Sequence, residues 1–218
     1  MRIVIFSNGI ISHPEQDRDQ LKPDDVLFAA DGGLHHCLRL KLTPHVLVGD
    51  LDSVDPEDVQ MLREGGTEII EHPARKDQTD LELAVNLAID RGANEIIILG
   101  GLGGRWDQTL ANILLITQDR FDAAEIQLIE GSQRILYLQP GRKHELSSRP
   151  GTTVSLIPID GTAGGIRTSG LEYELEDGSL ISGETRGVSN MMVADRASIS
   201  FQEGGLICIL IDGFDDLR

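Results

Sequence analysis

Short apolar runs alternate with helical patterns through the first two-thirds of the chain, and this alternation restricts the fold more than any other feature of the sequence. The runs are rich in β-branched residues and predict buried strands at residues 2–6, 26–30, 46–48, 67–71, 95–99 and 125–129. Amphipathic helices are predicted to begin near residues 34, 55, 80 and 108. This order predicts an α/β domain with a Rossmann-like, mostly parallel sheet that is flanked by helices on both faces.

Local signals mark the ends of one of these helices clearly. Asp55 is the predicted N-cap, Pro56 lies in the first turn, and Gly65-Gly66 ends the helix. The stretch at residues 7–23, in contrast, is polar and has no helical periodicity, so a loop is predicted there.

The pattern changes after about residue 132, where the apolar runs become short and glycine and proline recur between them. Strands are predicted at residues 135–138, 152–158, 171–175, 197–201 and 206–211. Runs of this kind indicate an antiparallel, all-β sandwich or barrel, and we favour the sandwich. We therefore expect two domains, at residues 1–132 and 133–218.

Composition excludes some classes of function. The formal net charge of −17 and the isoelectric point of about 4.6 argue against sequence-independent nucleic-acid binding, which needs clustered Lys and Arg. Cys37 and Cys208 lie in apolar segments, so we expect reduced thiols in the core rather than a disulfide framework. The chain shows neither a signal segment nor an apolar run of membrane-spanning length, and we expect it in the cytoplasm.

Two carboxylates with one residue between them follow the predicted strand at 46–48. After Gly49 come Asp50 and Asp52, and in an extended chain their side chains point to the same side. Their charges repel each other unless a cation lies between them, and Mg²⁺ prefers oxygen ligands of this kind. The alternative is an acidic surface turn, since the Asp-x-Asp pattern by itself is weak.

Three more polar or glycine-rich clusters also follow predicted strands. They are Asp31-Gly32-Gly33, Lys76-Asp77-Gln78-Thr79-Asp80 and the segment at residues 100–107, which reads Gly-Gly-Leu-Gly-Gly-Arg-Trp-Asp. In a parallel sheet the loops after the strands share one edge, so all four clusters are expected to converge there. That convergence favours a binding site over four unrelated surface loops.

Each cluster also has an ordinary explanation. The glycine segment lacks the spacing of a Walker loop or a dinucleotide fingerprint, so it is either a flexible turn or a loop whose bare amides approach phosphate oxygens. Arg105 would add a bidentate phosphate contact. Thr79 and Asp80 are candidate helix caps, and Lys76 is either a solvated charge or a phosphate ligand.

Together these motifs resemble the thiamine pyrophosphokinase (thiamine diphosphokinase) family. The resemblance rests on residues 30–33, 44–53, 76–80 and 103–108 in the first domain, and on residues 170–173 and 188–190 in the second. It spans nearly the whole chain. The sequence departs from the family at Gln108, where many bacterial members have His, and at Val188, where members often have Ser or Thr.

The resemblance implies transfer of the pyrophosphoryl group of ATP to the hydroxyl of thiamine, releasing AMP and thiamine diphosphate. It implies that the first domain is catalytic and binds Mg²⁺ and ATP, and that the second binds thiamine. It also implies that Asp50, Asp52 and Asp80 are the catalytic acids, which hold Mg²⁺ directly or through water, and that one of them accepts the proton of the thiamine hydroxyl. The residues implied for ATP are Asp31, Gly32, Lys76, Asp77, Thr79, Gly104 and Arg105, and those implied for thiamine are Ser189 and Asn190. It also implies a homodimer in which thiamine lies between the first domain of one subunit and the second domain of the other.

Two other classes of function stay open at this point. A diphosphokinase that acts on a hydroxymethyl pterin would use the same acids and glycine loop with a different acceptor pocket. A nucleotide-binding protein without enzymatic activity would need the ATP cleft and no acceptor site. The remaining alternative is a two-domain protein with an acidic surface and no binding site. On that alternative the convergence of the four clusters would be a coincidence.

Overall fold

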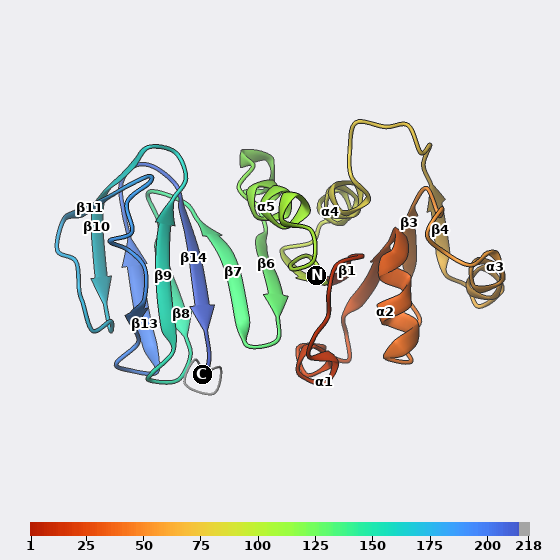
Figure 1. The fold of residues 1–218 in the computed structure, drawn as a ribbon, viewed down its shortest axis with the longest axis horizontal. Coiled ribbons are helices and arrows are strands. Elements are labelled where there is room, and N and C mark those ends of the chain that lie inside the picture. Colours follow the sequence, from red (N-terminus) through yellow and green to blue (C-terminus); the bar gives the residue numbers. More distant parts are fainter. Residues whose placement is uncertain (214–218) are drawn as a thin grey trace. The chain divides into compact units, whose positions relative to one another are not determined.

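The computed structural model describes residues 1–213 and separates into two compact units, Met1–Gly131 and a second unit that begins at Ser132. Each unit has its own strands (Figure 1). Each also has its own cluster of buried apolar residues. Cys37 and Cys208 are buried and unpaired, and burial raises the pKa of each thiol to about 12. In the part of the chain that is described, we find no helix whose length and apolar character would let it cross a membrane.

The first unit is built on six parallel strands in the order β6-β5-β1-β2-β3-β4. Their bounds are β1 Arg2–Phe6, β2 Val26–Ala30, β3 Val46–Gly49, β4 Glu68–Glu71, β5 Glu95–Leu99 and β6 Glu125–Glu130. The predicted mostly parallel sheet is therefore confirmed.

Helices flank this sheet (Figure 1). They are α1 Pro14–Arg18, α2 Leu34–Arg39, α3 Pro56–Glu64, α4 Asp80–Asp90 and α5 Trp106–Leu115, with short 3-10 turns at Asp31–Gly33 and Asp119–Phe121. Val4 and Phe6 of β1 share a buried apolar cluster with Leu34 of α2 and Leu62 of α3. Alternate residues of a strand point to opposite faces, so Ile3 and Ile5 face away from that cluster. The helix α4 packs against β1, β2 and β3.

The helix ends follow the local signals in the sequence. The side chain of Asp55 accepts a hydrogen bond from the Glu57 amide at 2.9 Å and caps α3, whose C-cap is Gly65. Thr79 caps α4 in the same way, through the Glu82 amide at 3.2 Å. The prediction of a loop throughout residues 7–23 is wrong, because α1 lies within it; this helix has only five residues, too few to show a helical period.

The second unit is antiparallel, as predicted, and its strands form the orders β12-β9-β14-β7 and β11-β10-β13-β8. Their bounds are β7 Gln133–Leu138, β8 Lys143–Ser147, β9 Thr153–Pro158, β10 Thr162–Ser169, β11 Gly178–Ile181, β12 Asn190–Met191, β13 Arg196–Ser200 and β14 Leu206–Ile211. One buried apolar cluster contains residues from most of these strands. The unit therefore has a core of its own.

The strand predicted at residues 171–175 is wrong. Leu171 forms only an isolated bridge with Met192, and Glu172 and Tyr173 are exposed. The Leu175 amide donates instead to the hydroxyl of Thr168, so the segment turns away from the ladder. Leu171 is buried and Leu175 partly buried although the segment is a turn, and a short apolar run cannot distinguish this arrangement from a strand.

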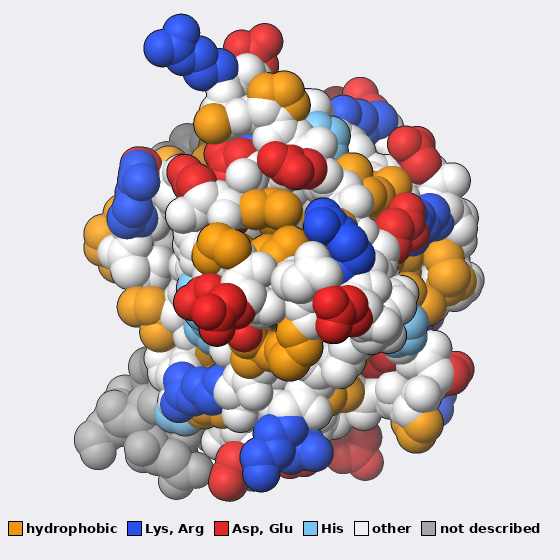
Figure 2. All heavy atoms as spheres, turned by 90° about the vertical axis from the view of Figure 1, so that its right-hand side faces the viewer, with side chains coloured by type: hydrophobic (Ala, Val, Ile, Leu, Met, Phe, Trp, Pro, Cys, Tyr) orange, Lys and Arg blue, Asp and Glu red, His pale blue; other side chains and the backbone are white. Residues whose placement is uncertain are grey.

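The surface of the first unit over α3 and β4 carries both signs of charge. Figure 2 shows this face, with acidic and basic side chains interspersed among small hydrophobic groups. The large negative charge of the chain is therefore not gathered into one acidic patch on this face.

Candidate active site

A cavity of about 480 Å³ opens at the carboxyl ends of β1 and β5 in the first unit. These strands are neighbours, but the chain continues from β1 toward β2 on one side and from β5 toward β6 on the other. Open α/β sheets bind ligands at such a point, where the strand order reverses. The lining residues come from the loops after three strands and from two helix starts: residues 7–10, Ala30, Asp31, 79–81, Gly100, Gly101, 103–105, Gln108 and Asn112.

Backbone hydrogen bonds join two of these loops, the one after β1 and the one after β5. The Ser7 amide donates to the Leu99 carbonyl at 2.8 Å, and the Gly9 amide donates to the Gly100 carbonyl at 2.7 Å, so pairing continues past the ends of β1 and β5. Gly100 has φ +68°, and a Cβ there would lie 2.5 Å from the Ser7 carbonyl oxygen. Only glycine permits this approach. The buried Asn112 side chain donates to the Gly101 carbonyl at 2.7 Å and ties the glycine segment to α5.

Three carboxylates meet beside this cavity. One carboxylate oxygen from each of Asp31, Asp50 and Asp52 lies within 4.8 Å of the others. Asp31 is only 6% exposed, and its Oδ1 is buried without a hydrogen-bond partner among the described residues. A buried carboxylate oxygen with no donor needs a partner, and oxygen ligands at this spacing fit a hard divalent cation. The donor set therefore suits Mg²⁺.

The backbone that places Asp31 is unusual. Asp31 has φ +45°, which is uncommon for a residue other than glycine, and it lies directly after β2. A Cβ at Gly49, the last residue of β3, would come within 2.9 Å of the Asp31 Cβ. The absence of a side chain at Gly49 thus lets the ends of β2 and β3 bring their acids together.

Lys76 links the cluster of three aspartates to the start of α4. Its ammonium lies 3.4 Å from Asp50 Oδ2 and 2.9 Å from Asp80 Oδ1. Burial raises the pKa of Asp50, but the Asp52 amide and the Lys76 ammonium lower it by more, so Asp50 is held ionised. Burial also lowers the pKa of Lys76, yet contact with Asp80 and Asp50 raises it overall. Lys76 therefore supplies positive charge at the site.

The structure groups the predicted metal residues differently from the sequence. Asp50 and Asp52 come together as expected, but through a turn with Leu51 at φ +61° rather than through an extended chain. The third member of their group is Asp31. Asp80 instead pairs with Lys76, one turn away along the chain. Asp31, which the sequence places in the ATP cleft, lines the cavity, but spacing along the chain does not reveal that its strand ends next to that of Asp50.

The predicted phosphate residues are divided between the cavity wall and the surface. Thr79, Gly104 and Arg105 line the cavity, whereas Asp77 is exposed and does not. The Arg105 Nε donates to Asp107 Oδ1 at 3.1 Å, and a second bond joins Arg105 Nη2 to Asp107 Oδ2. This pairing raises the pKa of Arg105 and lowers that of Asp107. Both side chains are exposed, so the guanidinium can exchange partners readily.

Sequence reasoning missed the loop after β1. Ser7 and Asn8 line the cavity, and the Asn8 side chain covers Gly32, where a Cβ would lie 2.4 Å from it. His36 was also missed; its Nε2 lies 2.9 Å from the Gly9 carbonyl oxygen and supports the loop from α2. The signal was available, because this loop also follows a strand of the parallel sheet.

Ser189 and Asn190 line a different cavity, of about 450 Å³, in the second unit. Ser189 has φ +63°, and its amide donates to the Ser155 hydroxyl at 3.0 Å. The Asn190 side chain donates to the Tyr173 carbonyl at 2.8 Å and accepts from the Tyr173 amide at 3.1 Å. Asn190 thus holds the turn that carries Tyr173, whose side chain is 68% exposed and lines the same cavity.

Comparison with protein families matches both units. A family model described as "Thiamin pyrophosphokinase, catalytic domain" matches residues 18–128. A second one, described as "Thiamin pyrophosphokinase, vitamin B1 binding domain", matches residues 143–206. The cavity with the three carboxylates lies in the unit matched by the first model, and the cavity with Ser189 and Asn190 lies in the unit matched by the second.

Individual relatives agree with these matches. The chain is 29% identical over 182 residues to thiamine pyrophosphokinase from Bacillus subtilis, covering 84% of this chain and 85% of that protein. It is 30% identical over 172 residues to thiamine pyrophosphokinase 1 from Oryza sativa subsp. japonica, covering 75% of this chain and 64% of that longer protein.

Solved structures agree as well. The crystal structure of the Bacillus subtilis thiamine pyrophosphokinase matches with a TM-score of 0.86 and 25% identity, covering 97% of this chain and 99% of that chain. The yeast thiamin pyrophosphokinase structure matches with a TM-score of 0.79 at 20% identity, covering 99% of this chain and 87% of that chain, and so supports the fold alone.

Proposed function

The chain belongs to the thiamin pyrophosphokinase family, and from this we propose that it transfers the pyrophosphoryl group of Mg²⁺–ATP to the hydroxyl of thiamine. The products are AMP and thiamine diphosphate. The observation that carries the proposal is the meeting of Asp31, Asp50 and Asp52 beside a cavity at the reversal of strand order, within the unit that the catalytic-domain model matches.

The reaction forms a bond between the thiamine hydroxyl oxygen and the β-phosphorus of ATP, and it breaks the bond between that phosphorus and the oxygen that leaves with AMP. The hydroxyl proton passes to one carboxylate of the site, for which Asp50, Asp52 and Asp80 are the candidates. Charge develops on phosphate oxygens, so positioning and electrostatic stabilisation supply most of the catalysis. Mg²⁺, when bound, neutralises phosphate charge and orients the phosphate chain. We assign its ligands to Asp31, Asp50 and Asp52, with Asp80 next to them through Lys76.

The positive groups have distinct tasks on this proposal. Lys76 is partly buried between two acids and acts as a fixed charge near the metal. Arg105 is exposed at the cavity edge and exchanges Asp107 for a phosphate group of ATP, which its planar fork can bind through two hydrogen bonds. The amides of Gly103 and Gly104, next to the start of α5, are free of side chains that would keep phosphate oxygens away.

The acceptor is bound through the second unit. Ser189 keeps the acceptor-binding role predicted from the sequence, since it lines the cavity of that unit. For Asn190 the hydrogen bonds to Tyr173 support a different role. Its side-chain amide bonds to the Tyr173 backbone and positions that turn, and it does not bind the ligand itself. The exposed Tyr173 ring then offers a flat surface for an aromatic acceptor.

We also propose a homodimer, as the family resemblance implies, with each active site drawing on two chains. Mixing an Asp52→Asn variant with a Ser189→Ala variant tests this. If sites are shared, exchanged subunits regain part of the activity. If subunit exchange is demonstrated and no activity returns, each site is built within one chain.

The function itself is tested by measuring AMP release with ATP, Mg²⁺ and candidate acceptors. We expect AMP to form only when thiamine is present, in equal amount to thiamine diphosphate. An Asp52→Asn variant should be inactive, while Asp24→Asn, which alters an exposed acid away from the site, should match the wild type. Transfer to a hydroxymethyl pterin instead of thiamine would replace the proposal, and ATP binding without any acceptor-dependent AMP would refute it.

A further inference from the structure

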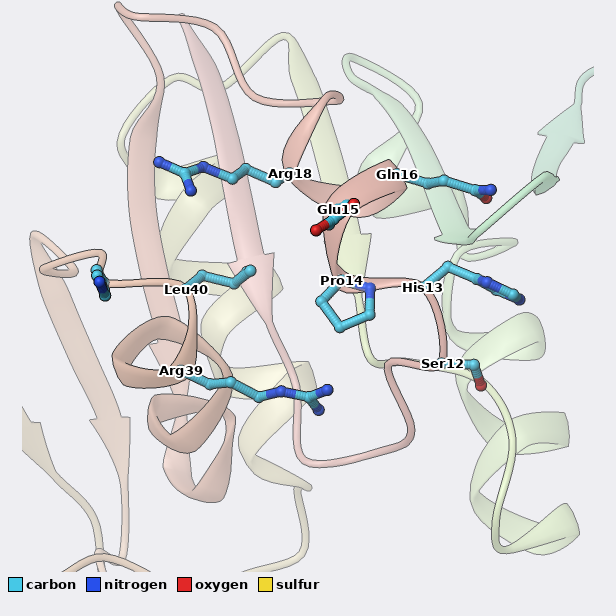
Figure 3. A pocket seen from close by; sticks show the side chains of 9 residues that line it. Ser12, His13, Pro14, Glu15, Gln16, Arg18, Arg39 and Leu40 are labelled. Atoms are coloured by element: carbon cyan, nitrogen blue, oxygen red, sulfur yellow. The ribbon is translucent and has the colours of Figure 1, made fainter.

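A second cavity in the first unit lies between α1 and the end of α2 and has a volume of about 630 Å³. It is lined by residues 12–16, Arg18 and residues 39–41, and Figure 3 shows it from close by. It shares no lining residue with the cavity at the ends of β1 and β5. We call it the α1–α2 cavity.

Three basic side chains line this cavity without an acidic partner. Arg18, Arg39 and Lys41 are exposed, and none of them forms an ion pair with any residue from 1 to 213. In a chain of net charge −17, carboxylates that could neutralise them are plentiful elsewhere. Glu15 is the single acidic residue among the lining residues of this cavity. The three basic side chains and Glu15 together therefore carry a net charge of two positive.

The two arginines come from different elements. In Figure 3 the Arg18 side chain extends from α1, and the Arg39 side chain extends from α2 on the other side of Leu40. Their guanidinium groups point in opposite directions in Figure 3, but both side chains are exposed and free to turn. Each planar fork matches phosphate oxygens, so both can turn toward an anion between α1 and α2. Two positive charges in excess favour a dianion over a monoanion.

The floor of the cavity is apolar. Leu40 is 8% exposed and belongs to the same buried cluster as Ile11 and Leu34, and Pro14 lies beside it in the wall. A ring or chain attached to the anion can rest on this floor and remove apolar surface from water. Basic groups above an apolar floor match a phosphate ester better than an inorganic ion.

We propose that the α1–α2 cavity binds a small organic phosphate as a dianion, at a site separate from the catalytic cavity. Arg18 and Arg39 bind the phosphate group, Lys41 adds charge, and Leu40 with Pro14 contacts the organic part. Glu15 opposes a third negative charge, so a monoester fits better than a triphosphate. The site needs no metal, which distinguishes it from the carboxylate group at Asp31, Asp50 and Asp52.

The test is a titration of the full chain with phenyl phosphate in the presence of EDTA, followed by backbone amide NMR. EDTA removes divalent cations, so any phosphate binding through a metal at Asp31, Asp50 and Asp52 is suppressed. We expect saturable shifts at residues 12–18 and 39–41, and weaker binding of inorganic phosphate at the same amides, since it lacks the apolar part. An Arg18→Gln/Arg39→Gln double variant should bind phenyl phosphate at least about tenfold more weakly, because charge-assisted hydrogen bonds are lost.

The matched control is Arg63→Gln, which removes an arginine on α3 that also has no ion pair among the described residues. Its affinity should equal that of the wild type. If the double variant does not fold, Arg39→Lys keeps the charge without the fork and should still weaken binding severalfold. The proposal is overturned by no saturable shift at millimolar phenyl phosphate, by equal affinity in all variants, or by shifts confined to residues 7–10 and 100–105.

Discussion

The buried carboxyl group of Asp17 gives the sharpest prediction about stability. Asp17 lies in α1 with no exposed surface, and its Oδ1 accepts a hydrogen bond from the Gly131 amide at 3.0 Å. Its Oδ2 and the Oε2 of Glu130 are both buried without a hydrogen-bond partner among the described residues. Burial raises the pKa of Asp17 from 3.8 to about 6; the Gly131 amide opposes this rise, and the charge of Glu130 adds to it. Near neutral pH the fold therefore contains a buried charge that it does not fully solvate.

The size of the effect follows from the change in pKa. The folded protein holds the Asp17 proton more tightly than the unfolded chain, so the free energy of unfolding falls as pH rises from about 4 to about 6. One pKa unit corresponds to about 1.4 kcal/mol, which makes the loss at pH 7 up to about 3 kcal/mol. An Asp17→Asn variant keeps an acceptor for Gly131, adds a donor that can bind Glu130, and removes the charge. We expect it to be more stable than the wild type above pH 6 and nearly equal to it at pH 4.

Thermal unfolding at a series of pH values measures this directly. At pH 7.5 the midpoint of Asp17→Asn should exceed that of the wild type by roughly 5 °C or more, and the difference should vanish toward pH 4. Asp19→Asn is the control, because Asp19 is the exposed C-cap residue of the same helix and its replacement should change little at any pH. A stabilisation that does not vary with pH, or a less stable variant at pH 7.5, would refute the reasoning.

Two further predictions concern the catalytic cavity. Asp31→Asn should abolish AMP release at every Mg²⁺ concentration while leaving the melting temperature equal or higher, since it relieves repulsion among three carboxylates; activity restored by excess Mg²⁺ would exclude Asp31 as a required ligand. His36→Leu should raise the KM for ATP severalfold with a smaller effect on melting temperature, because the Gly9 carbonyl loses its imidazole donor, and His36→Gln should recover part of the loss; equal KM values would remove His36 from loop positioning.

The parallel sheet could be predicted because its evidence is local. The strands β1, β3 and β5 are runs of mainly apolar, often β-branched residues that are buried almost throughout, as expected in a parallel sheet covered on both faces. The edge strand β4, Glu-Ile-Ile-Glu, is not such a run. The second unit was predicted less completely. Its strands β8 and β10 contain charged, polar or glycine residues and pair through the backbone, so they carry no apolar run to read.

The candidate site likewise has a part that local sequence predicts and a part that depends on contacts between distant segments. That Asp50 and Asp52 share a location follows from their spacing in the chain, but Asp31 joins them only because Gly49 lets β2 and β3 end close together. The loop at residues 7–10 becomes part of the cavity through its pairing with Gly100, over 90 residues away. Such contacts depend on strand order, which the alternation of strands and helices leaves open.

Charge explains why metal and nucleotide must bind together on the proposed function. Three carboxylates lie beside the cavity, and Lys76 is already shared between Asp50 and Asp80. Arg105 is shared with Asp107, so neither cation is free to neutralise a triphosphate without giving up an acid. A triphosphate alone would therefore meet repulsion, and a divalent cation alone would leave its remaining ligand positions to water. Asp31, Asp50 and Asp52 would hold the cation, and phosphate oxygens of ATP would take ligand positions that the three carboxylates leave open. We therefore expect the affinity for ATP at this site to depend on the metal.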